Sequence, residues 1–60
     1  MYVLSNFKEL YDIAKENEFS VNLVNLSIKD RLRTIDFLAG LTYKNGKIEK
    51  INANIFKVTL

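Results

Sequence analysis

The sequence predicts a single small α/β domain, an α+β sandwich with the element order βαβαββ. Three features predict it: two segments of helical periodicity, short β-branched and aromatic segments around them, and a length of 60 residues, enough for one domain. We expect a mixed sheet with both helices on one face, because a strand–helix–strand unit crosses over right-handed and pairs its strands in parallel.

The first half of the chain predicts a strand, a helix and a second strand. Met1–Leu4 is short, aromatic and β-branched, which is typical of a strand. Asn6 and Glu9 match a capping box, so a helix should begin there. Apolar residues then recur at helical spacing: Phe7, Leu10, Tyr11 and Ala14. Alternating apolar residues over Phe19–Val24 predict the second strand.

The second predicted helix runs from Ser27, a favourable N-cap, to about Tyr43. Placing residues about 100° apart around its axis gives an apolar stripe that we expect to face the core. The stripe consists of Ile28, Leu32, Ile35, Ala39 and Thr42, with Leu38 at its edge. Phe37 and Leu41 fall on the opposite side, where an isolated small domain should expose polar residues. We therefore expect a second copy of the chain, or a peptide partner, to cover that side.

Gly40 lies inside this helix, where a glycine costs about 1 kcal/mol relative to alanine. Close approach of another helix and a break in the last helical turn explain it equally well. A chain of this size is marginally stable alone, and the absence of Cys excludes a disulfide as a support. The small size and the lack of disulfides leave oligomerisation as the remaining support, in agreement with the second apolar side of this helix.

The last third predicts two strands. Asn45-Gly46 is the strongest turn signal in the chain, and it precedes a strand over Lys47–Asn52. Ile48 and Ile51 are three residues apart, so we expect a bulge or a short strand there. Ile55–Leu60 forms the last strand. The uncovered face of the sheet is a second candidate surface for self-association.

The residue types predict no enzyme, no cofactor and no metal site. There is no His, the commonest general base and metal ligand, and none of the Ser or Thr hydroxyls has a His to activate it. The helix carboxylates Glu9, Asp12, Asp30 and Asp36 have no paired partner in an apolar pocket. The two glycines form no phosphate-binding loop.

The net charge of +2 is mild and mixed along the chain, so we expect no nucleic-acid partner. Two alternatives to a peptide adaptor stay open. One is a small nucleic-acid-binding module, whose affinity for an oligonucleotide should fall steeply with salt. The other is a purely structural self-association module.

The segment Arg33–Gly40, together with Asn22-Leu23 and Tyr43, resembles the SepF family of bacterial cell-division proteins. In that family an Asn-Leu pair closes a strand, and an Asp-Phe-Leu-small-Gly run ends the second helix. The run begins thirteen residues after the leucine, as Asp36 does after Leu23.

The resemblance extends over essentially the whole chain. The family has a glycine-containing turn, an Ile-basic-Ile strand and an Ile-Phe strand, matched in order by Gly46–Ile51 and Ile55–Leu60. Phe7 and Ile13-Ala14 match its first helix.

The resemblance implies an α/β core that forms a homodimer and can polymerise, and that binds the C-terminal peptide of FtsZ, the tubulin-like division protein. It implies a protein of the cytoplasm at the division site, supporting assembly of the septum. We predict that the dimer or partner interface is formed by Phe37, Gly40, Leu41, Tyr43, Ile48 and Phe56.

The sequence departs from the family pattern at three points, and the third concerns membrane binding. The first helix with its following loop is about one turn shorter, and Leu60 stands where the family has a proline and a further segment. The family's N-terminal membrane-binding helix and linker have no counterpart in residues 1–60, which correspond to the core domain alone. The sequence is either an excised core or a minimal homologue, and we expect membrane contact only through segments it does not contain.

Overall fold

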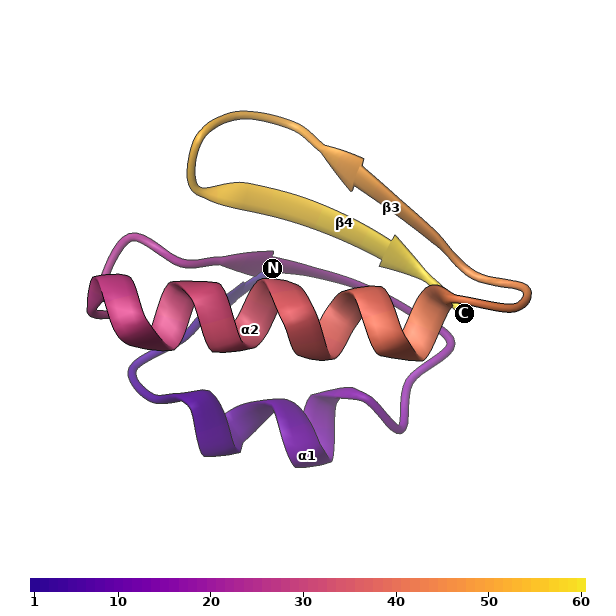
Figure 1. Cartoon of the computed structure of the whole chain (residues 1–60), viewed down its shortest axis with the longest axis horizontal. Helices are drawn as coiled ribbons and strands as arrows, with labels where there is room; N and C mark the ends of the chain where they lie inside the picture. Colours follow the sequence, from indigo (N-terminus) through magenta and orange to yellow (C-terminus); the bar gives the residue numbers. More distant parts are fainter.

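Four strands form one mixed sheet, and the helices cover one of its faces (Figure 1). This computed structural model describes all 60 residues. The elements are β1 (Tyr2–Val3), the 3-10 helix η1 (Phe7–Glu9), α1 (Leu10–Ile13), β2 (Glu18–Asn22), α2 (Ile28–Thr42), β3 (Lys47–Lys50) and β4 (Ile55–Thr59). The strand order is β1-β2-β4-β3, with β1 parallel to β2 and the other neighbours antiparallel. The predicted element order, mixed sheet and parallel first pair are confirmed.

The register of the strands decides which side chains meet the helices. Phe19 of β2 is paired with Val58 of β4, and Val58 is paired with Ile48 of β3. Directly paired residues point to the same face of a sheet, so these three share the face under the helices. The core consists of nine buried apolar residues: Leu4, Leu10, Ile13, Phe19, Val21, Leu23, Leu26, Leu38 and Val58.

The first helix begins where the capping residues predict. The Glu9 carboxylate accepts hydrogen bonds from the backbone N–H groups of Ser5 at 2.6 Å and Asn6 at 2.8 Å. Helical structure then covers Phe7–Ile13 and ends before Ala14, the last residue of the predicted apolar spacing. It buries Leu10 and Ile13.

A side-chain contact ties β1 to the segment that follows α1. The Tyr2 hydroxyl donates a hydrogen bond to the Glu16 carboxylate. This bond, together with the nearby Glu16 charge, raises the pKa of Tyr2 above its ordinary value. A raised folded-state pKa means that the contact contributes below the ordinary tyrosine pKa and is lost as the pH rises through the raised value.

Helix α2 begins at the predicted N-cap. The Ser27 Oγ accepts a hydrogen bond from the Asp30 N–H at 3.2 Å. The Arg31 guanidinium folds back and donates to the Leu26 carbonyl at 3.3 Å and to the Val24 carbonyl at 3.2 Å. It thereby fixes the loop between β2 and α2.

The turn between α2 and β3 lies at the predicted position, but the reason for its glycine is steric. Gly46 does not have a positive φ. A Cβ at this position would lie 2.8 Å from the Thr42 Cα and 2.8 Å from the Thr59 carbonyl oxygen. Strand β3 is short, as expected, and ends before Ile51.

Thr34 is the one buried polar residue of the core, and its hydroxyl has no hydrogen-bond partner. Thr34→Val should therefore raise the free energy of unfolding by about 1 kcal/mol, because it removes an unsatisfied buried hydroxyl while keeping the branched shape. Urea unfolding monitored by circular dichroism measures the change. Thr34→Ser, which keeps the hydroxyl and loses the methyl group, is the control and should destabilise; a loss of stability in Thr34→Val would contradict the assignment.

Candidate functional site

Helix α2 buries a side that lies about 100° around its axis from the predicted stripe. Thr34 is fully buried and Leu38 is 1% exposed, so these residues face the sheet. Ile28, Leu32 and Ile35, predicted as core residues, lie on the surface. The prediction of the core-facing stripe was therefore wrong except at its edge, where Leu38 is buried.

The exposed apolar surface of α2 is a stripe along the helix, which we call the outer stripe. It consists of Ile28, Leu32, Ile35 and Ala39, of which the first three are 79%, 60% and 41% exposed. At about 100° per residue these four fall within about 60° of one another. A run of large apolar side chains on one exposed helix face is a candidate contact surface.

Phe37 is partly buried, packs against the core and marks the side of α2 that faces α1. Its ring lies edge-on to Phe7 at 5.6 Å and to Tyr11 at 5.8 Å between centroids. The Arg33 guanidinium lies over the Phe7 ring at 5.1 Å. Such edge-to-face contacts stabilise by about 0.5–1.5 kcal/mol each beyond the area that they bury. This aromatic cluster attaches η1 and α1 to α2.

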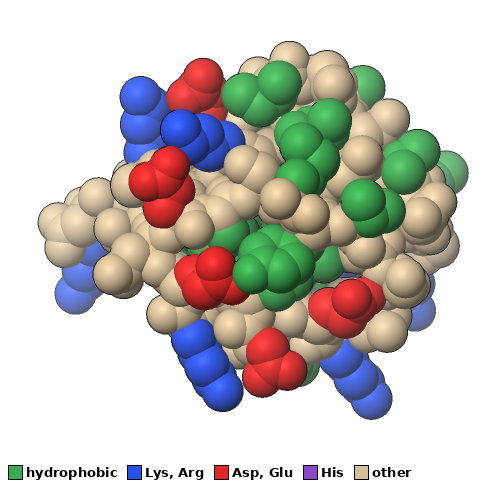
Figure 2. All heavy atoms as spheres, turned by 180° about the vertical axis from the view of Figure 1, so that it is seen from behind, with side chains coloured by type: hydrophobic (Ala, Val, Ile, Leu, Met, Phe, Trp, Pro, Cys, Tyr) green, Lys and Arg blue, Asp and Glu red, His purple; other side chains and the backbone are tan.

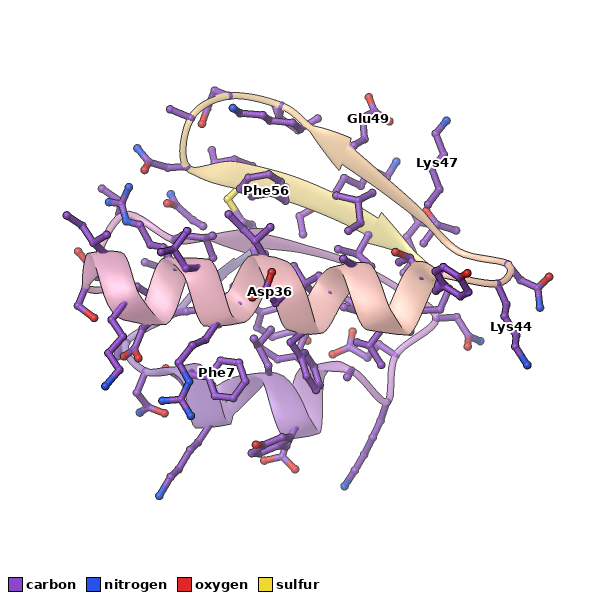
Figure 3. All side chains as sticks on the ribbon, in the orientation of Figure 1. Phe7, Asp36, Lys44, Lys47, Glu49 and Phe56 are labelled. Carbon is purple, nitrogen blue, oxygen red and sulfur yellow. The ribbon has the colours of Figure 1, made fainter.

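The outer stripe lies on the side of α2 away from this cluster, since Ile28 and Phe37 are about 180° apart around the axis. In Figure 1 the β3–β4 hairpin lies on that side of α2, opposite α1. Phe56 lies over β4 in the view of Figure 3, and its partner in the sheet is the buried Val21, so it is on the face under the helices. Phe56 and Ile48 are only partly buried and pack against the core. These two predicted site residues therefore lie on the same side as the outer stripe.

The remaining predicted site residues lie near the C-terminal end of α2, and the structure does not bring them together. Tyr43 is 86% exposed and Leu41 is 38% exposed. Gly40 is exposed, and a Cβ there would meet nothing within 4 Å. Close approach within the chain therefore does not explain Gly40.

The charges beside the outer stripe have opposite signs at its two ends. Lys29 follows Ile28, and Asp36 follows Ile35, two helical turns further on. Both lie on the flank of the stripe that faces away from the sheet, and neither forms an ion pair. Figure 3 shows Asp36 on the exposed side of the helix.

The outer face of the sheet is divided between apolar and charged residues, and Figure 2 shows both. Val3, Asn22 and Ile55 form a row across three strands. The Ile51 N–H donates to the Ile55 carbonyl at 2.9 Å, so Ile51 extends this row just beyond the end of β3. Further along, the Lys57 ammonium lies 3.3 Å from the Glu18 carboxylate. The uncovered face thus carries an apolar row at one end and a charged pair further along.

The surface holds no pocket, and no cluster of three or more His, Cys, Asp or Glu side chains is arranged to bind a metal ion. None of the helices has the length and apolar character needed to cross a membrane. No protein-family model and no curated protein sequence matches the chain.

Proposed function

We propose that this chain is a non-enzymatic adaptor core of the SepF kind, which self-associates through the outer stripe of α2 and binds the C-terminal peptide of FtsZ. The observation that carries the self-association is the exposure of Ile28, Leu32 and Ile35 on one helix face. The FtsZ partner rests on the sequence resemblance described above.

Burying the outer stripe supplies the driving force for association. A Val, Leu or Ile side chain that passes from water to an apolar contact contributes about 1.5–3 kcal/mol. Ile28 and Leu32 are mostly exposed in the single chain, so nearly all of this contribution is still available to a partner. A small domain gains more from such a contact than a large one, because its own core is limited.

The flanking charges favour an antiparallel arrangement of two α2 helices. In an antiparallel two-fold pair, the same flank of each helix meets that of its partner. Antiparallel helices centred between Leu32 and Arg33 place Lys29 of one copy beside Asp36 of the other. A parallel two-fold pair instead brings opposite flanks of the two helices together, so Lys29 and Asp36 of different copies are not neighbours. These exposed charges contribute little energy, but they set orientation.

The partner peptide in this proposal binds where the outer stripe borders the hairpin. Ile48 and Phe56 supply partly exposed apolar surface there, and Tyr43 supplies an exposed aromatic ring near the end of the helix. Aromatic residues in this setting are frequent anchors of peptide contacts.

Leu32→Asp should abolish self-association and leave the fold intact, because a charge in the centre of a buried contact is costly whereas an exposed carboxylate on the single chain is not. Sedimentation velocity over a concentration series measures association, and circular dichroism measures folding. Val24→Asp is the matched control, because Val24 is 48% exposed and lies outside α2; it should associate as the unmodified chain does.

Two outcomes contradict this proposal. An unmodified chain that stays monomeric at all concentrations rejects self-association, and a dimeric Leu32→Asp variant rejects the outer stripe as its surface. Titration with the FtsZ C-terminal peptide tests the partner separately. Absence of binding at high micromolar peptide rejects the FtsZ part and leaves self-association standing.

A further inference from the structure

Asn45 differs from every other asparagine of the chain in the residue that follows it. Gly46 has no side chain, whereas the other six asparagines precede residues that carry a Cβ. Those residues are Phe7, Glu18, Leu23, Leu26, Ala53 and Ile55. Asn45 is also exposed, in the turn between α2 and β3. The backbone nitrogen that follows Asn45 is therefore the least obstructed one next to an asparagine side chain.

We propose that Asn45 is a site of spontaneous deamidation whose rate is controlled by opening of the turn at Gly46. The Gly46 nitrogen attacks Cγ of Asn45, and the new N–Cγ bond closes a cyclic imide as the Cγ–Nδ2 bond breaks. The amide proton passes through solvent to the departing nitrogen, which leaves as ammonia. Water then opens the imide at either carbonyl and gives aspartate or isoaspartate, with no oxidant or reductant involved.

The folded turn holds the attacking nitrogen in place. The Gly46 N–H donates a hydrogen bond to the Thr42 carbonyl at 3.1 Å, so the nitrogen keeps its proton and is oriented toward α2. The position of Gly46 is also fixed by the backbone of Thr42 on one side and of Thr59 on the other. Ring closure requires this hydrogen bond to break, so the reaction proceeds from the locally opened chain.

The product weakens the turn from which it forms. The new carboxylate lies just beyond the C-terminal end of α2, where a negative charge is unfavourable. Isoaspartate also adds a methylene group to the backbone at residue 45, which displaces the next residue, Gly46, and a Cβ on Gly46 would already lie 2.8 Å from the backbone of Thr42 and of Thr59. The net charge of the chain falls from +2 to +1, since one neutral amide becomes one carboxylate (2 − 1 = 1).

Incubating the whole chain at mildly alkaline pH, in native buffer and in denaturing urea, tests the proposal by peptide mapping and by enzymatic methylation of isoaspartate. Conversion in urea should occur at Asn45 before any other asparagine. In native buffer it should be slower by at least about tenfold, which corresponds to an opening free energy of about 1.4 kcal/mol.

Asn52 is the internal control, because it precedes the small residue Ala53 and its side-chain oxygen accepts two backbone N–H groups, from Asn54 at 2.9 Å and Ile55 at 3.0 Å. In urea, Gly46→Ala should slow conversion at Asn45, because the added Cβ obstructs the nitrogen. Equal rates at Asn45 and Asn52 in urea would overturn the site. Equal rates at Asn45 in buffer and in urea would overturn control by the turn.

Discussion

Leu38→Ala should lower the free energy of unfolding by about 2–5 kcal/mol, because Leu38 is 1% exposed and its removal leaves a cavity between α2 and the sheet. A domain of this length has a total stability of about 3–9 kcal/mol. The substitution therefore removes a large part of it and should leave a substantial unfolded fraction at room temperature.

Leu32→Ala is the matched control on the same helix. Leu32 is 60% exposed, so its truncation should change the stability of the single chain by less than about 0.5 kcal/mol. Urea unfolding at a concentration where the chain is monomeric separates this effect from association, which stabilises by mass action. A larger loss in Leu32→Ala than in Leu38→Ala would mean that the two faces of α2 are assigned the wrong way round.

The local features of the fold follow from the sequence because their causes are local. Ser27 begins α2 through its own side chain, and Glu9 begins η1 in the same way. The turn at Gly46 and the shortness of β3 are likewise visible in the sequence. The first helix is shorter than its apolar spacing predicts, and that spacing does not single out Ile13, which the fold buries.

The orientation of α2 does not follow from the sequence, because two stripes of this helix have helical spacing. Ile28, Leu32 and Ile35 form the more apolar one, and periodicity favours it. The structure buries the other, which contains Thr34 and Leu38, because Phe37 beside them packs onto Phe7. Only contacts with elements distant in sequence choose between the stripes. Of the six predicted interface residues, Phe37 packs against Phe7, and the other five are divided between the end of α2 and the hairpin.

The residues that carry the family resemblance are largely explained by packing inside the chain. Phe37 holds α1 through the aromatic cluster, and Leu38 fills the core. Side chains that pack inside the chain determine its fold, and a resemblance carried by them is evidence for a shared fold more than for a shared partner. The outer stripe, which precedes and overlaps that segment, is the part of α2 whose side chains the single chain leaves unused. Gly40 is the exception, since nothing in the chain requires it.

The two glycines should respond to alanine in opposite directions. Gly46→Ala should lower the free energy of unfolding by about 1–3 kcal/mol, the usual cost of overpacking. The atoms that the new Cβ meets are the Thr42 Cα and the Thr59 carbonyl oxygen, both backbone and both at 2.8 Å, so no rotation of a side chain relieves the contact. The reduced freedom of the unfolded chain offsets only about 0.4–1 kcal/mol of this cost.

Gly40→Ala makes the same chemical change in open space within α2. It should raise the free energy of unfolding by up to about 1 kcal/mol, because alanine is the better helix former and its Cβ meets nothing. Paired urea unfolding curves of the two variants measure the difference, and equal shifts would contradict the steric account of Gly46. Gly40 lies about 100° around the helix from the outer stripe, so Gly40→Ala should leave sedimentation unchanged. A weaker association in that variant would instead place Gly40 in the helix contact, and the interface would then extend around α2 toward the side that faces away from the sheet.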